Sequence, residues 1–211
     1  MHNEFVASAK TVIEGHKINP DFMIGCMIAH LTNYPLTPDP KDVMKGLDTM
    51  NFMNNFCGDV HVRGEYPHYT KKLLSDNGVT DFSFLENEED LAIIKEGKVD
   101  MYTFSYYMSA CSTTHEAELG AGNVFMGVKN PYLEASPWGW QIDPIGLRIS
   151  LVDLYDRYRK PLFVVENGLG AKDELVNGTV DDQYRIDYFD AHFKEMYNAI
   201  VEDGVDLMGY T

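Results

Sequence analysis

One carboxylate in the sequence stands where an α/β protein would place a reacting group. Residues 161–165 are Pro-Leu-Phe-Val-Val, Glu166 follows directly, and Asn167-Gly168 comes next. The apolar run predicts a buried strand, and the Asn-Gly pair predicts the turn after it. Glu166 is therefore expected at the C-terminal mouth of a strand, where barrels and open sheets both carry their reacting groups. From this pattern alone, catalysis and an acidic cap at the strand end are equally good interpretations.

Helical periodicities and short apolar runs alternate along the rest of the chain. The expected helices cover residues 5–16, 41–57, 145–158 and 181–201, and the expected strands cover residues 22–29, 99–108, 161–165 and 205–210. This alternation predicts a parallel α/β fold, but it does not separate an open doubly wound sheet from part of a closed barrel. The sequence starts on a helix and ends on a strand, and a barrel typically takes about 250 residues. We therefore expect a piece of a larger unit.

The overall composition disfavours several classes of function. The sequence has 17 basic and 33 acidic residues, a formal charge of −16, which would repel a nucleic acid backbone. No run approaches the roughly 18 to 20 apolar residues that cross a bilayer, and the N-terminus lacks the order of a signal peptide. We expect a cytoplasmic protein with no nucleic acid partner and no membrane partner.

Residues that could hold a metal or a cofactor are scattered. Cys26, Cys57 and Cys111 form no CxxC pair, and the seven histidines form no HExxH pattern. No glycine loop of the phosphate-binding kind lies between a strand and a helix start. We therefore expect no metal and no cofactor, and we expect the cysteines to be reduced.

Several short motifs resemble those of glycoside hydrolase family 1. Residues 165–168, Val-Glu-Asn-Gly, resemble the family's (Ile/Val)-(Thr/Val)-Glu-Asn-Gly signature, whose glutamate is the nucleophile. Tyr106-Tyr107 is similar to its Asn-Tyr-Tyr, residues 139–147 to its Gly-Trp and Pro-x-Gly-Leu, and residues 63–67 to its Gly-x-Tyr-Pro. Phe-Ser-Tyr-Tyr at 104–107 and Trp-Gly-Trp-Gln-Ile-Asp-Pro at 138–144 resemble the 6-phospho-β-glucosidase branch.

The resemblance implies a fold and a reaction. The fold would be a partial TIM (β/α)8 barrel, about strands 5–8 with their helices, so that residues 1–211 form the C-terminal half of a single barrel with no second domain. The reaction would be the hydrolysis of 6-phospho-β-glucosides with retention, through two carboxylates that lie about 5 to 5.5 Å apart. The expected partner is thus a small phosphorylated β-glucoside.

The resemblance also assigns roles to residues of the site. Glu166 would be the nucleophile, and the phenol of Tyr107 would donate a hydrogen bond that keeps it ionised and oriented. Trp140, Tyr106 and Asn167 would bind substrate, with the indole of Trp140 as a flat apolar platform. By spacing alone, however, Tyr107 is more often a core aromatic, and Trp140 is equally a residue that anchors its loop.

Two expected parts of the family's site do not occur in this sequence. No Asn-Glu-Pro is present, so the acid/base is expected outside this chain, and the branch's phosphate-binding Ser, Lys and Tyr would fall beyond Thr211. We therefore expect the isolated chain to be inactive. We also expect it to self-associate, since a half barrel exposes two strand edges and an apolar inner face.

Two alternatives stay open at this point. One is a family 1 β-glucosidase or β-galactosidase that acts on an unphosphorylated substrate. The other is a truncated, non-catalytic half barrel that acts as a binding or oligomerisation module.

Overall fold

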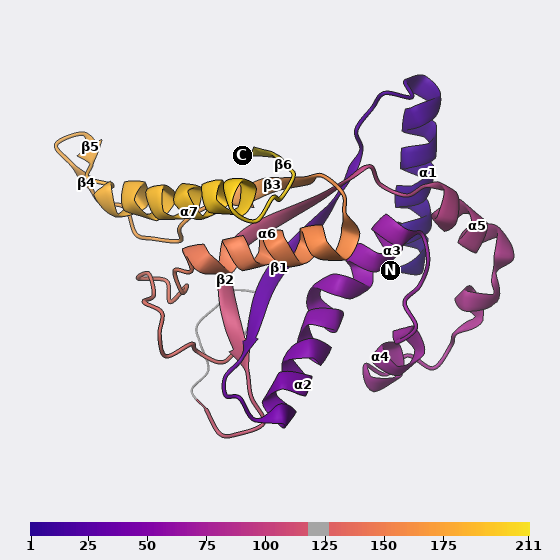
Figure 1. The fold of residues 1–211 in the computed structure, drawn as a ribbon, viewed down its shortest axis with the longest axis horizontal. Coiled ribbons are helices and arrows are strands. Elements are labelled where there is room, and N and C mark those ends of the chain that lie inside the picture. The colour runs from indigo at the N-terminus through magenta and orange to yellow at the C-terminus, as the bar shows by residue number, and fades with distance from the viewer. Residues whose placement is uncertain (118–126) are drawn as a thin grey trace.

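A parallel sheet of four strands forms the centre of the molecule. The computed structural model describes residues 1–117 and 127–211. The strands are β1 (Gly25–Pro35), β2 (Met101–Ser112), β3 (Leu162–Asn167) and β6 (Leu207–Tyr210). They lie in the order β1-β2-β3-β6, so each new strand adds to the same edge of the sheet (Figure 1). A doubly wound sheet reverses its strand order at a switch point, whereas a barrel does not. The topology is that of a barrel segment.

Some of the helices cover one face of this sheet, and others form a second apolar cluster beside it. The helices are α1 (His2–Ile18), α2 (Pro40–Met50), α3 (Phe56–Arg63), α4 (Thr70–Asp76), α5 (Glu88–Glu96), α6 (Pro144–Tyr158) and α7 (Gln183–Val201). A π-helical turn, Asn51–Asn55, joins α2 to α3, a 3-10 turn spans Ser83–Glu86, and a small hairpin of β4 (Leu175–Val176) and β5 (Thr179–Val180) precedes α7. The long helices α6 and α7 lie side by side across the sheet (Figure 1). No helix in the described ranges is long and apolar enough to span a bilayer.

The main core lies between the sheet and this helical layer. Tyr102, Phe104 and Tyr106 alternate along β2, and all three are fully buried. They belong to one cluster with Leu147 of α6 and Met196 of α7. Because side chains alternate between the two faces of a strand, the residues between them face the other way.

The opposite face of the sheet is partly uncovered at its two edge strands. Met27 of β1 and Met208 of β6 are 53% and 49% exposed, and Ala29 is exposed as well. A parallel sheet is normally covered on both faces. The uncovered face is therefore the one that would line the interior of a closed barrel.

The four expected strands and three of the four expected helices are confirmed, but several bounds differ. β1 continues to Pro35, six residues beyond the expected end, because its polar residues find partners: Thr32 bonds to the hydroxyl of Ser150, and Ser112 donates to Asn33 over 2.9 Å. The helix expected over residues 41–57 is instead the succession of α2, the π-helical turn and α3.

The helices α4 and α5 and the β4–β5 hairpin have no counterpart in the sequence-based expectation. The acidic residues Glu88, Glu89 and Asp90 form the first turn of α5, and Asn87 caps it by accepting a hydrogen bond from the Asp90 backbone. Carboxylates at this position are stabilised by the positive end of the helix dipole. This acidic run is thus a helix start.

Candidate active site at the strand ends

A bulge in β3 decides which way Glu166 points. Phe104 pairs with Val164, but the next residue of β2, Ser105, pairs with Glu166, so Val165 is one extra residue. In a regular strand Glu166 would share the helix-covered face with Val164, which is fully buried. The extra residue turns Glu166 to the opposite face instead. There Glu166 is exposed, in the same row as Ala29 and Ser105.

Tyr107 meets Glu166 on this face. Its hydroxyl donates a hydrogen bond of 3.1 Å to Oε2 of Glu166, across strands β2 and β3. The pKa of Tyr107 is raised by partial burial and by the hydrogen bond and negative charge of Glu166, so the phenol stays protonated and remains a donor at neutral pH. The pair that the motifs suggested is therefore in contact.

Two tryptophans border this pair. The ring of Trp140 lies edge-on to Tyr107, with centroids 5.5 Å apart, and Trp138 lies edge-on to Trp140 at 5.6 Å. Both pack over Gly170, where an added Cβ would come within 2.5 Å of Trp138 and 3.1 Å of Trp140. The chain that leaves β3 can pass under the indoles only because residue 170 has no side chain. The platform role of Trp140 stays a prediction, and its place beside Tyr107 suits it.

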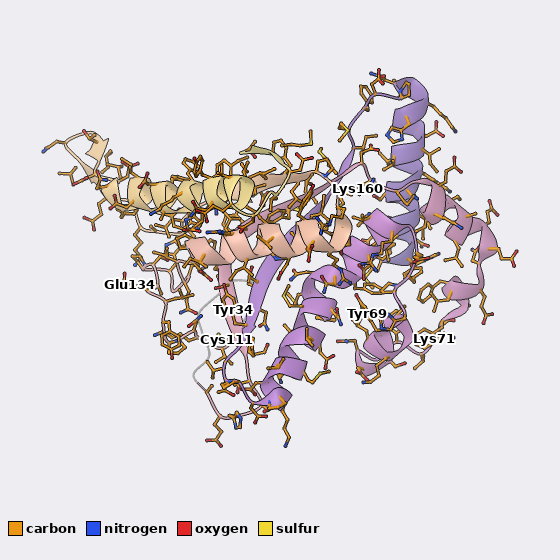
Figure 2. The ribbon with its side chains drawn as sticks, in the orientation of Figure 1. Tyr34, Tyr69, Lys71, Cys111, Glu134 and Lys160 are labelled. Atoms are coloured by element: carbon orange, nitrogen blue, oxygen red, sulfur yellow. The ribbon has the colours of Figure 1, made fainter. Side chains whose placement is uncertain are left out.

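Asp143 fixes the tryptophan loop, the segment that carries Trp138 and Trp140, to the strand ends. Its carboxylate is 4% exposed and accepts three hydrogen bonds, from the hydroxyls of Tyr34 (2.8 Å) and Ser109 (2.5 Å) and from the backbone of Gly146 (2.8 Å). The last bond caps α6, which begins at Pro144, the residue type favoured at a first helical position. Tyr34 itself lies near the end of β1, beside Cys111 of β2 (Figure 2). Glu134 lies on the loop between β2 and α6 (Figure 2).

A second buried carboxylate holds the segment that follows β2. Asp42, in the first turn of α2, accepts hydrogen bonds from the hydroxyls of Thr37, Thr113 and Thr114 and from the Thr114 backbone, over 2.6 to 2.9 Å. Burial opposes its ionisation, but the bonds from Thr114, Thr37 and Thr113 outweigh burial and hold the pKa of Asp42 well below its usual range.

Tyr106 does not lie at the mouth of the site. It is fully buried on the helix-covered face, and its hydroxyl donates to the backbone carbonyl of Asp143 over 2.7 Å. Adjacent residues of a strand point to opposite faces, so Tyr106 and Tyr107 cannot both reach the same ligand. The expected substrate contact of Tyr106 is corrected to a structural role that supports the tryptophan loop.

Asn167 is used by the protein itself. Its side-chain Nδ2 donates to the carbonyl of Tyr106 (2.7 Å) and to the hydroxyl of Tyr188 (2.9 Å), and its Oδ1 accepts from the hydroxyl of Tyr210 (3.0 Å). A substrate contact by Asn167 stays a prediction, and these three bonds already occupy its side-chain amide within the protein.

The sequence did not indicate roles for Asp143, Tyr188 and Tyr210. Only Asp143 carries a local signal, the Asp-Pro-x-Gly of a capped helix start.

No cluster of three or more His, Cys, Asp or Glu residues that could hold a metal ion occurs within residues 1–117 and 127–211. The cysteines in these ranges are free thiols, and burial raises the pKa of Cys26 to about 11.

Comparison with known proteins places this geometry in a family. The sequence profile described as "Glycosyl hydrolase family 1" matches residues 1–211. The chain belongs to glycosyl hydrolase family 1. Within this family it is 53% identical over 218 residues to a 6-phospho-beta-glucosidase of Clostridium longisporum, covering 100% of this chain and 45% of that protein. It is 51% identical over 213 residues to the aryl-phospho-beta-D-glucosidase BglH of Bacillus subtilis, covering 100% of this chain and 44% of that protein.

Solved structures of the family share the fold. The family 1 β-glucosidase of Exiguobacterium antarcticum superimposes with a TM-score of 0.82 at 22% identity, covering 99% of this chain and 46% of that chain. The expected partial TIM barrel is therefore confirmed. The chain spans about 45% of the length of the curated relatives that it matches.

Proposed function

We propose that this chain provides the nucleophile half of a retaining β-glycosidase that hydrolyses 6-phospho-β-glucosides, and that residues 1–211 form the C-terminal half of one barrel. The observation that carries the proposal is the contact between the Tyr107 hydroxyl and the exposed carboxylate of Glu166 at the strand ends. The substrate class rests on relatives at 53% and 51% identity whose names specify phosphorylated β-glucosides.

Glu166 would act in two steps. One carboxylate oxygen attacks the anomeric carbon, and the bond to the leaving oxygen breaks as a second carboxylic acid gives that oxygen its proton. The second group, now ionised, takes a proton from water, and the water oxygen displaces Glu166 to restore the starting configuration. Tyr107 holds Oε2 of Glu166, which leaves the other oxygen to attack. Trp140 would border the bound sugar or its leaving group.

The second carboxylate and the phosphate contacts would come from parts of a complete barrel outside these residues. The sequence has no Asn-Glu-Pro, and its net charge of −16 means that a phosphorylated sugar needs cationic groups placed locally. The proposed site is therefore incomplete in this chain alone. The loss of a general acid typically lowers the rate by roughly 10² to 10⁴, so the isolated chain should hydrolyse glycosides poorly.

The substrate class is tested on a complete barrel that contains residues 1–211. The rates are compared for the nitrophenyl β-glucoside with and without the 6-phosphate. We expect the phosphorylated compound to be hydrolysed much faster. Equal rates, or a faster reaction of the unphosphorylated compound, would favour an unphosphorylated substrate instead. Glu166→Gln should lower kcat by roughly 10⁴ or more, as nucleophile loss does elsewhere. Glu134→Gln, an exposed acid on the loop before α6, is the matched control and should have no effect.

The isolated chain is expected to be inactive and to self-associate. Within residues 1–117 and 127–211 its sheet ends at β1 and β6, and Met27 and Met208 expose apolar surface on the uncovered face. Turnover of a 6-phospho-β-glucoside by the isolated chain would contradict the first expectation. A monodisperse monomer in light scattering would contradict the second.

A further inference from the structure

The buried hydroxyl of Tyr188 contacts the backbone of Tyr107 and the side chain of Asn167, the residue after Glu166. Tyr188 lies on α7 and is 3% exposed. Its oxygen accepts a hydrogen bond from Nδ2 of Asn167, the residue after Glu166, over 2.9 Å. The same hydroxyl donates a weaker bond of 3.5 Å to the backbone carbonyl of Tyr107. One oxygen atom thus bridges β2 and β3 where they carry the pair.

The bulge at Val165 leaves only Glu166 and Asn167 of β3 paired with β2 beyond it, and the Tyr188 bridge adds a restraint at this strand end. A bulge disrupts the local hydrogen-bond ladder and leaves one residue unpaired, so the strand end needs other restraints to keep its direction. Here the extra residue sends Glu166 to the open face and Asn167 to the helix-covered face, where Tyr188 lies. If Asn167 moved, Glu166 would move with it, because the two are neighbours on the same backbone.

The ring of Tyr188 is itself held in place. It stacks on His192, one turn further along α7, with centroids 3.8 Å apart and planes at 29°. Nδ1 of His192 donates to the Tyr188 carbonyl over 2.7 Å. Burial raises the pKa of Tyr188, so its hydroxyl keeps its proton at neutral pH and can donate to Tyr107 while it accepts from Asn167.

We propose that Tyr188 is a positioning residue for the active site: through Asn167 and the Tyr107 carbonyl, its hydroxyl sets the distance between the Tyr107 phenol and the Glu166 carboxylate. The catalytic consequence rests on the proposed function, but the geometric one does not. A tyrosine that only fills the core would not need its hydroxyl for the contact between Tyr107 and Glu166. The two roles therefore differ in what happens when the hydroxyl alone is removed.

The first experiment needs no activity. A complete barrel that contains residues 1–211 is labelled at tyrosine Cζ, the Tyr107 resonance is assigned with the Tyr107→Phe variant, and its chemical shift is followed through the ionisation of Glu166. The step is the change in the Tyr107 chemical shift when Glu166 ionises. Because the field of a charge falls with distance, Tyr188→Phe should reduce this step by roughly twofold or abolish it. Tyr197→Phe is the control, since Tyr197 lies on the same helix and is 63% exposed. Equal steps in the two variants would overturn the proposal.

A second variant covers the case in which Tyr188→Phe does not fold. Asn167→Ser breaks the same link from the β3 side and leaves the Tyr188 ring on His192. It should reduce the step in the Tyr107 shift in the same way, and an unchanged step would overturn the proposal.

The second experiment uses a complete barrel that contains residues 1–211. Tyr188→Phe should lower kcat by roughly tenfold and change KM by less than about twofold, because a misplaced nucleophile affects the chemical step more than binding. Tyr197→Phe should leave both constants unchanged. A fall in kcat that is equal in the two variants, or a change in KM alone, would overturn the catalytic consequence. If the unsubstituted barrel hydrolysed no β-glycoside, the proposed function would fail, and the resonance of Tyr107 would still decide the positioning role.

Discussion

Asp143→Asn tests whether a single buried carboxylate fixes the mouth of the site. The substituted amide has one acceptor oxygen and one NH2 group, but three donors face this position: the hydroxyls of Tyr34 and Ser109 and the backbone of Gly146. If the amide oxygen still accepts the hydrogen bond from Gly146, the NH2 group faces the hydroxyls of Tyr34 and Ser109. These hydroxyls can then no longer donate to residue 143, because the NH2 group is itself a donor.

The cost follows from counting these bonds. Two charge-assisted hydrogen bonds are lost or reversed at a site that is 4% exposed, where water cannot replace them. At about 1 to 2 kcal/mol for each, the free energy of unfolding should fall by about 2 to 4 kcal/mol. For a chain of this size that corresponds to a decrease in Tm of roughly 5 to 15 °C.

Urea unfolding followed by circular dichroism and tryptophan fluorescence measures this change. The only two tryptophans of the sequence, Trp138 and Trp140, lie on the loop that Asp143 anchors, so the emission spectrum should shift to the red as well. The control is Asp156→Asn, because Asp156 lies on α6, the helix that Asp143 caps, and its side chain is 73% exposed. A loss of stability below about 0.5 kcal/mol, equal to that expected of the control, would refute the anchoring role of Asp143.

Three further substitutions report on the charges of the fold and the site. Burial lowers the pKa of His30 to about 4, below its unfolded value of about 6.5, so His30 should lower the free energy of unfolding by about 3 kcal/mol as the pH falls from about 6.5 to about 4. In urea unfolding at several pH values, His30→Leu should remove this contribution, whereas substitution of the exposed His68 should preserve it. Asp42 has a depressed pKa, so its contribution is complete above about pH 4 and is lost below it; the destabilisation by Asp42→Asn should therefore shrink as the pH falls below about 4, and a penalty independent of pH would contradict this. Glu166→Gln removes the negative charge, one of the three causes that raise the pKa of Tyr107, so the Tyr107 resonance should titrate at lower pH, and an unchanged titration would show that the two groups are not in contact in solution.

The strand that carries Glu166 was predictable, but the direction of its side chain was not. An apolar run followed by Asn-Gly predicts a strand end, and the family motif adds the carboxylate. The bulge at Val165 has no local signal, because Val-Val is favoured in any strand. Without the pairing partner Ser105, the sequence leaves open which face Glu166 takes.

The misplaced Tyr106 could have been excluded from the sequence. Neighbouring residues on a strand face opposite sides, so a contact of Tyr107 with Glu166 already implies that Tyr106 points away from Glu166. The contacts of Asp143 are different in kind. Its partner Tyr34 is 109 positions away, and no periodicity or turn signal links two residues over that distance. Only the fold brings them together.

Trapping the covalent intermediate would identify the nucleophile. A complete barrel that contains residues 1–211 is incubated with a 2-deoxy-2-fluoro-6-phospho-β-glucoside that has a good leaving group, and the labelled peptide is sequenced by mass spectrometry. We expect one sugar phosphate, bound as an ester to the carboxylate of Glu166, and no label in the Glu166→Gln variant. A label on any other residue, or hydrolysis of 6-phospho-β-glucosides with inversion at the anomeric carbon, would contradict it.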